Sequence, residues 1–201
     1  MRSDTVILAF DTSAAHCAAA LLRAGAITAV AVEEMGKGQA ERLMPLLEEM
    51  LAAQGLHWRD LDAIAVGVGP GNFTGVRIAV SAARGLALAL KIPAIGVSTL
   101  DALAEGAPRP VTVVMDARRD EVYAQDFTAE GAGAPHLLPR ADLDASGPTR
   151  EGITGAELIE AIAQIAARRL ATGETVPRPA PLYLRGADAA PPSDPPPVIL
   201  D

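Results

Sequence analysis

The sequence predicts an α/β protein whose two halves begin alike. Short apolar runs bounded by turn residues, typical of strands, alternate with segments of helical periodicity. A pattern of strand, polar turn and strand also occurs twice, once around Asp11 and again around Asp116. Self-similarity over such a long interval indicates two related lobes. With only two copies, a chance resemblance between two hairpins remains the alternative.

Composition narrows the class of protein further. Half of the 201 residues are apolar, 21% are charged, 3% are aromatic, and the net charge is −8. This excludes a disordered chain, and the acidic balance argues against a broad basic face for nucleic acid. Cys17 is the single cysteine, so the chain cannot form an internal disulfide, which indicates a reducing compartment. No uninterrupted apolar run reaches the ~18 residues of a membrane helix, and the sequence opens without a signal-peptide pattern. We therefore expect a cytoplasmic protein.

Residues 1–105 are expected to form the first lobe. Its strands are predicted at 5–10, 17–22, 27–35, 63–68 and 92–97. Apolar residues at three- and four-residue spacing predict a helix over 39–54, with Pro45 in its first turn. A second helix over 75–90 consists mostly of small residues, which permit close helix approach, and Thr74 is its predicted N-cap. A short helix is predicted over 101–105.

Residues 106–201 are expected to form the second lobe. The stretch 129–155 is rich in Gly and Pro and is predicted to be loop, whereas 157–170 is a predicted amphipathic helix. A proline-rich tail is expected from about residue 188, with residues 182–184 as the ordered part of the preceding stretch.

Candidate chemistry is sparse. Asp11 and Asp116 each end a strand and open a tight turn, which suits either phosphate and Mg²⁺ binding or a simple Asx-turn. The glycine-rich loop 67–75 opens a helix but matches neither common phosphate-loop pattern, so a structural elbow between strand and helix is favoured.

The histidines and the cysteine do not form a recognisable site either. His16, His57 and His136 lack metal-ligand spacing, and Cys17 is predicted to be a core residue rather than a nucleophile paired with His16. No catalytic residue and no metal ligand is predicted.

Several segments, in this order, resemble one family. They are residues 7–13, 69–77 with 85–88, 95–100, 116–118 with 121–123, and 183–185. Together they are similar to the TsaB (YeaZ) family of bacterial proteins, which act in the synthesis of threonylcarbamoyladenosine in tRNA. The similarity covers residues 5–128 well and the rest thinly.

The resemblance implies an actin-like (ASKHA) two-lobed α/β fold, with mixed sheets flanked by helices. The second lobe should be reduced, because the region between 127 and 157 is shorter than the family's. The resemblance also implies a non-catalytic subunit that binds and supports the catalytic subunit TsaD together with the ATPase TsaE. Contact with tRNA would occur only through that complex. No cofactor would be bound independently, although ATP or ADP could sit at the partner junction. A glycoprotease-like hydrolase or a nucleotide-hydrolysing member of the fold remains the alternative.

The resemblance also assigns residues. Partner contact is expected on the helices 39–54 and 75–90, and the same surface should form a homodimer when the protein is isolated. The interface residues expected there are Leu43, Leu47, Met50, Val76, Ala79, Ala83 and Ala87. The residues assigned to nucleotide binding are Asp11, Thr12, Ser13, Asp116 and Arg118.

Overall fold

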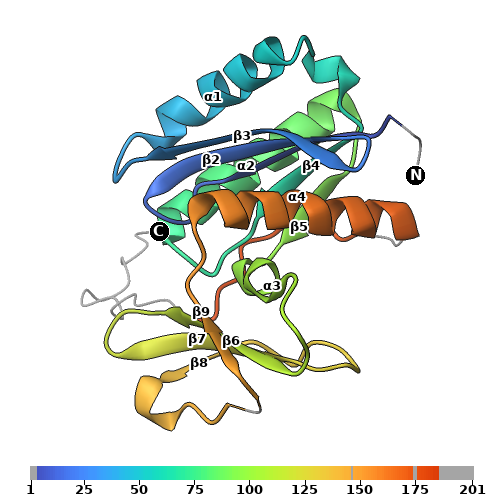
Figure 1. The fold of residues 1–201 in the computed structure, drawn as a ribbon. Coiled ribbons are helices and arrows are strands. Elements are labelled where there is room, and N and C mark those ends of the chain that lie inside the picture. The colour runs from blue at the N-terminus through green and yellow to red at the C-terminus, as the bar shows by residue number, and fades with distance from the viewer. Residues whose placement is uncertain (1–3, 146, 174–175, 186–201) are drawn as a thin grey trace, which may run out of the picture.

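The computed structural model describes residues 4–145, 147–173 and 176–185. Its strands are β1 (Val6–Asp11), β2 (His16–Arg23), β3 (Ala26–Glu34), β4 (Ala63–Gly67), β5 (Ala94–Val97), β6 (Val111–Asp116), β7 (Glu121–Phe127), β8 (His136–Pro139) and β9 (Thr149–Glu151). Its α-helices are α1 (Gln39–Ala53), α2 (Phe73–Leu90), α3 (Thr99–Ala104) and α4 (Gly155–Thr172). Figure 1 shows one sheet above the other, with α3 between them.

The two sheets share one topology. The first has the strand order β3-β2-β1-β4-β5, and the second has the order β8-β7-β6-β9. In the first, β1 pairs antiparallel with β2 and parallel with β4; in the second, β6 pairs in the same two ways with β7 and β9. The second sheet therefore repeats the first four strands of the first sheet. This agrees with the prediction of two related halves, and the second sheet is the smaller one.

Helices cover both faces of the first sheet (Figure 1). Leu8 and Phe10 of β1 pack against α1 and α2, whereas their neighbours Ile7 and Ala9 face α4. This alternation follows from the pleat of a strand, which sends successive side chains to opposite faces. Because both faces are buried, the strand reads as an unbroken apolar run in the sequence.

The position of α4 corrects the predicted lobe boundary. The side chains of Leu158, Ile159 and Ile162 belong to the core under the first sheet, not to the second lobe. Residues 106–201 are therefore not one structural unit, and the second sheet is left with little helical cover of its own. The short helix α3 packs against it instead, through Leu100 and Leu103.

Two predicted helix details are wrong. Pro45 lies at the seventh position of α1 rather than in its first turn, because the helix begins directly after the left-handed Gly38. The N-cap of α2 is Asn72, not Thr74: its side chain accepts hydrogen bonds from the backbone amides of Thr74 and Gly75. An Asn preceding the helix satisfies two free amides at once, which a Thr inside the first turn cannot do.

The stretch 129–155 is not all loop. It contains β8 and β9, two short edge strands whose pairing with the second sheet outweighs a local composition rich in Gly and Pro. The segment 176–185 has no regular secondary structure, yet the Leu182 amide donates to the Val68 carbonyl at 2.8 Å. The predicted tail from residue 188 lies outside the described residues.

Candidate functional site

The turn between β1 and β2 holds a buried polar cluster around Asp11. This residue is fully buried, and its Oδ1 accepts hydrogen bonds from the backbone amide and the hydroxyl of Ser13, both at 2.9 Å. His16 Nε2 lies 2.9 Å from the same oxygen, whereas Oδ2 is buried without a hydrogen-bond partner. The carboxylate therefore organises its own hairpin, as an Asx-turn does.

The glycine-rich loop between β4 and α2 closes over this turn. A Cβ atom at Gly67 would lie 1.9 Å from Asp11 Oδ2, and a Cβ at Gly75 would lie 1.8 Å from the Thr12 carbonyl oxygen. The Thr12 hydroxyl in turn donates to the Gly75 carbonyl at 2.6 Å. A side chain has no room at either glycine, because Gly67 lies against the Asp11 carboxylate and Gly75 against the Thr12 backbone, so the prediction of a structural elbow is confirmed.

The residues assigned to nucleotide binding fall into two groups. Asp11, Thr12 and Ser13 are buried beneath the loop, whereas Asp116 and Arg118 are exposed on the β6–β7 hairpin. The first group can reach a nucleotide only if the loop opens. A site for ATP or ADP at a partner junction stays a prediction.

The β6–β7 hairpin carries two sets of ion pairs, one exposed around Arg140 and one half-buried at Arg185. Asp116 pairs with Arg140, which also pairs with Glu151 at 3.2 Å, and both carboxylates raise the pKa of the guanidinium. Arg185 pairs with Glu121 at 2.6 Å, which raises the pKa of Arg185 in the same way.

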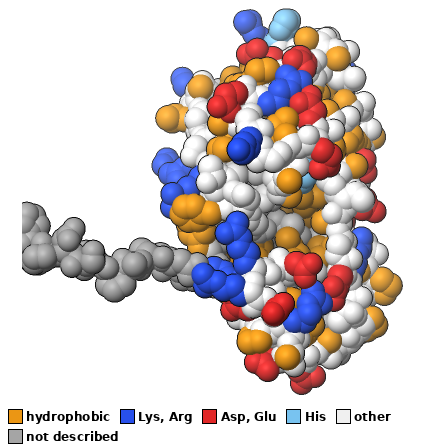
Figure 2. Space-filling view, turned by 90° about the vertical axis from the view of Figure 1, so that its left-hand side faces the viewer, with side chains coloured by type: hydrophobic (Ala, Val, Ile, Leu, Met, Phe, Trp, Pro, Cys, Tyr) orange, Lys and Arg blue, Asp and Glu red, His pale blue; other side chains and the backbone are white. Residues whose placement is uncertain are grey.

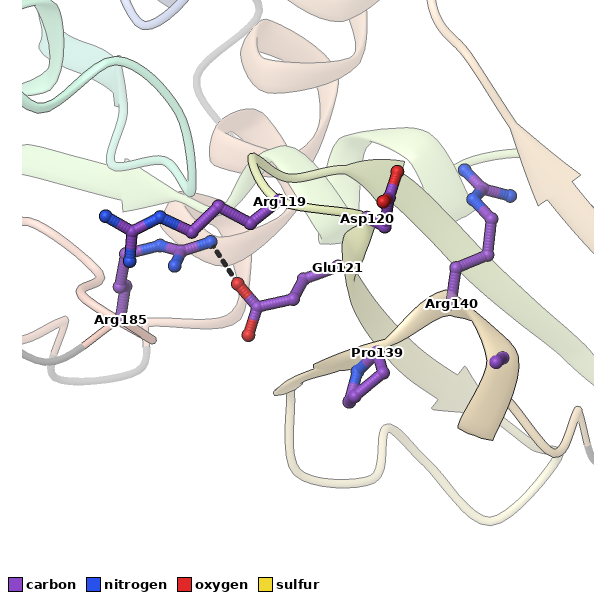
Figure 3. Close-up of a pocket in the computed structure, with 7 residues that line it drawn as sticks. Arg119, Asp120, Glu121, Pro139, Arg140 and Arg185 are labelled. Carbon is purple, nitrogen blue, oxygen red and sulfur yellow. Dashed lines mark ion pairs between the residues drawn. The ribbon is translucent and has the colours of Figure 1, made fainter.

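An open pocket of about 710 Å³ lies beside this hairpin (Figure 3). Its lining residues are Arg119, Asp120, Glu121, Pro139, Arg140, Ala141 and Arg185. Figure 3 shows the side chains of Arg119 and Arg185 next to each other on one side of the pocket, with Arg140 on the other side. Arg185 also donates to the Arg118 carbonyl at 3.1 Å, so the C-terminal segment is attached to the hairpin tip.

Most of the residues predicted for the partner interface are in the wrong place to contact a partner. Six of them lie in this chain's own core, between the helices and the first sheet: Leu43, Leu47, Met50, Val76, Ala79 and Ala83. Ala87 keeps partial exposure. The physical reason is that the apolar stripe of an amphipathic helix packs first against its own sheet.

The outward faces of α1 and α2 have a different composition. The exposed residues of α2 are Phe73, Thr74, Arg77, Ser81, Arg84, Gly85, Leu88 and Ala89, and those of α1 include Glu41, Pro45, Glu48 and Ala52. Leu88 is 79% exposed, and a Cβ at Gly85 would meet no atom within 4 Å. We call the exposed residues in the second half of α2 the outer face of α2; they are Ser81, Arg84, Gly85, Leu88 and Ala89.

An exposed aromatic cluster at the start of α2 was missed by sequence reasoning. The Arg77 guanidinium lies 3.7 Å from the centroid of the Phe73 ring, and its Nε donates to the Tyr183 hydroxyl at 2.7 Å. The two ring centroids are 5.2 Å apart, and the two residues are 53% and 47% exposed. The available signal was that the segments 69–77 and 183–185 both belong to the family resemblance.

The buried thiol has the character of a core group. Burial, followed by the nearby Glu33 carboxylate, raises the pKa of Cys17 to about 11. The prediction that Cys17 is a core residue is confirmed, because it is fully buried on the side of the sheet that faces α1 and α2. In the described part of the chain, no three His, Cys, Asp or Glu side chains gather as a metal ion would require.

Among the residues that the structure describes, α2 alone has the length and mean hydropathy to cross a membrane. This is weak evidence for a span, since helices in the cores of soluble proteins can have the same two properties.

Comparison with known proteins gives consistent matches. The family model described as "TsaD: tRNA N6-adenosine threonylcarbamoyltransferase" matches residues 30–138. The tRNA threonylcarbamoyladenosine biosynthesis protein TsaB of Escherichia coli is 39% identical over 135 residues, which are 65% of this chain and 58% of that protein. An uncharacterized protein of Mycobacterium tuberculosis is 34% identical over 200 residues, covering 93% of this chain and 95% of that one. A solved structure of YeaZ from Pseudomonas aeruginosa is 30% identical with a TM-score of 0.76, covering 90% of this chain and all of that one.

The repeated sheet topology and this structural match define the class: the molecule is an α/β protein with the actin-like, two-lobed fold. Within that class, the chain belongs to the TsaB (YeaZ) family. Its matched region spans between 56% and 60% of the length of the first three curated TsaB relatives.

Proposed function

We propose that this chain is a non-catalytic subunit in the synthesis of threonylcarbamoyladenosine in tRNA. In this role it binds and supports a TsaD-like catalytic subunit, together with a TsaE-like ATPase, in the cytoplasm. Relatives named for tRNA threonylcarbamoyladenosine biosynthesis support the pathway, and the family model matched is that of the transferase. Binding of tRNA is assigned to the complex as a whole.

The observation that carries the non-catalytic role is the state of the Asp11 cluster. An aspartate in such a hairpin turn could bind a metal ion or a phosphate. Here Oδ1 is occupied by Ser13 and His16, and Oδ2 lies against Gly67, where no substrate atom can approach. The cluster is therefore structural, and it offers no general base and no activated nucleophile to solvent.

The outer face of α2 supports the binding role. A contiguous exposed surface with a large apolar side chain is typical of an interaction site, and Leu88 is such a side chain. The exposed Gly85 and Ala89 next to it would let a partner helix approach closely. In the isolated protein the same face would form a homodimer, which excludes the catalytic partner because one face cannot hold both. A nucleotide held at the junction with the partner remains part of the proposal.

Enzyme assays test this function against the hydrolase alternative. The purified chain should release no phosphate from ATP and cleave no peptide. Added to the TsaD-like and TsaE-like proteins, it should raise transfer of the threonylcarbamoyl group to tRNA. Hydrolysis by the chain alone would contradict the proposal if it is abolished in a folded Asp11→Asn variant but kept in Asp116→Asn, which changes an exposed carboxylate on the other hairpin.

A further inference from the structure

We propose that the aromatic cluster at the start of α2 and the arginines of the β6–β7 hairpin together bind an unpaired nucleotide segment of RNA. This rests on the proposed function, because it assigns the chain its own contact with the tRNA on which the complex acts. The proposal is independent of the outer face of α2, since it uses different residues.

The first component is a stacking surface. Phe73 and Tyr183 are among only six aromatic residues in the chain, yet both are about half exposed and lie together. The Arg77 guanidinium lies over the Phe73 ring and holds the Tyr183 hydroxyl, so the group is ordered before any ligand arrives. Exposed ring faces and arginine planes are the groups on which proteins stack unpaired bases.

The second component is the positive charge of the β6–β7 hairpin, to which the segment carrying Tyr183 is attached. Tyr183 belongs to the segment 176–185, which crosses from the first sheet to the second: Leu182 is hydrogen-bonded to Val68, and Arg185 reaches the β6–β7 hairpin. Tyr183 is two residues along the chain from Arg185, whose guanidinium contacts the hairpin tip. Figure 2 looks onto this side of the molecule and shows hydrophobic side chains next to Lys and Arg side chains between its upper and lower parts.

The net charge of the region around the rings and the hairpin is positive, whereas that of the whole chain is negative. The cations of this region are Arg77, Arg118, Arg119, Arg140 and Arg185, and the carboxylates beside them are Asp116, Asp120 and Glu121. Arg185 is held by Glu121, so the phosphate contacts fall mainly to Arg118, which is exposed at the hairpin tip. A net positive region on a protein of net charge −8 is the electrostatic condition for a local RNA contact.

The chemistry favours unpaired RNA over the other ligands that positive charge attracts. In a duplex the bases are already stacked on each other and cannot reach the rings. An acidic peptide would be attracted by the arginines but gains nothing from the exposed ring faces. Stacking together with phosphate contacts is therefore the combination that this surface fits.

The test measures binding of the full chain to a fluorescent RNA hairpin with an unpaired loop and to the blunt duplex of the same stem. We expect the loop RNA to bind at least about tenfold more tightly than the duplex, with affinity falling as salt is raised. Tyr183→Ala and Phe73→Ala should each weaken loop binding by about tenfold. Arg23→Ala, which removes an exposed arginine at the opposite end of the first sheet, should change it less than about twofold. Ultraviolet crosslinking should attach the RNA to the peptide that contains residue 183 or residue 73.

Several results would overturn the proposal. Equal affinity for loop and duplex, or loop binding that the folded ring variants leave unchanged, would exclude stacking. Displacement of the RNA by polyglutamate of equal charge would reduce the site to an unspecific cationic patch. Binding of ATP that is lost in the ring variants, without any RNA binding, would make it a site for a free nucleotide instead. The same variants are tested for co-elution with the TsaD-like subunit: retained co-elution without RNA binding means that this inference alone fails.

Discussion

Gly67 lies directly against the carboxylate of Asp11: a Cβ atom at Gly67 would be 1.9 Å from Oδ2. The strand that carries this glycine, β4, runs parallel to β1 and therefore ends beside the same hairpin turn. The absence of a side chain on one strand thus allows a buried carboxylate on the next. This contact joins the hairpin turn to the glycine-rich loop and keeps both closed.

Replacing Gly67 by alanine should destabilise the protein strongly. The added methyl group cannot fit, so either the Asp11 side chain or the strand must move, and a buried hydrogen-bond cluster is broken. We expect a loss of roughly 3 kcal/mol in the free energy of unfolding. Denaturant unfolding of Gly67→Ala measures it. Gly36→Ala is the matched control, because a Cβ there meets no atom within 4 Å; it should change stability by less than ~0.5 kcal/mol. A stable Gly67→Ala would contradict the contact.

Replacing Gly85 by alanine should have the opposite effect. Gly85 lies inside α2 with open space around its would-be Cβ, so the substitution removes backbone freedom from the unfolded chain without a clash. The gain should be about 1 kcal/mol, seen as a higher melting temperature. A lower melting temperature would mean that this part of α2 packs against atoms of the same chain.

The start of α4 should depend on its capping box. The Thr154 hydroxyl accepts from the Glu157 amide at 3.2 Å, and the Glu157 carboxylate accepts from the Thr154 amide at 2.9 Å. Because Thr154→Ala removes one of these two bonds, it should lower the free energy of unfolding by about 1 kcal/mol at neutral pH.

The same box has a defined pH dependence. The Thr154 backbone amide, followed by its hydroxyl, lowers the pKa of Glu157 below 4.5. A depressed carboxyl pKa stabilises the fold above the unfolded value, and this contribution is lost as pH falls through the folded value. The wild type should therefore lose its advantage over Glu157→Gln as the pH drops below 4.5. An unchanged difference in melting temperature across that range would count against the capping box.

Cys17 should resist thiol reagents in the native protein. A pKa of about 11 leaves roughly 0.1% thiolate at pH 8, and the side chain is fully buried. Labelling by a disulfide reagent should therefore be slow in buffer and fast in denaturant. Rapid labelling under native conditions would show that β2 opens locally, because only opening can expose this thiol.

The repeat of the two hairpins and the helix α4 could be predicted from the sequence, because apolar periodicity and turn residues are local signals. The pairing of β8 with β7 and of β9 with β6 could not be predicted, since edge strands as short as three residues depend on their neighbours in the sheet. The approach of Gly67 to Asp11 joins residues 56 positions apart, and the contact of Phe73 with Tyr183 joins residues 110 positions apart. Only the fold brings such pairs together.

The predicted interface shows a different limit. The resemblance implies a partner contact on α1 and α2, and Leu47 and Ala83 are apolar or small as an interface residue would be, but these are also the properties of a core residue. Exposure separates the two roles, and the sequence does not encode it directly. Leu88 and Gly85 are exposed on α2, and this exposure becomes visible only when the buried side of the helix is known.

The most direct test of the proposed partner surface is the affinity of the chain for the TsaD-like subunit, measured by calorimetry with the variants Gly85→Glu and Leu88→Glu. Both residues are exposed, so the folded monomer should survive, which the melting temperature checks. A buried, unpaired carboxylate in a close-packed interface should weaken binding at least about a hundredfold. Val30→Glu makes a similar change on β3, away from α2, and should leave the affinity within about twofold. If folded Gly85→Glu and Leu88→Glu proteins bind the subunit as tightly as the wild type, the outer face of α2 is not the partner surface.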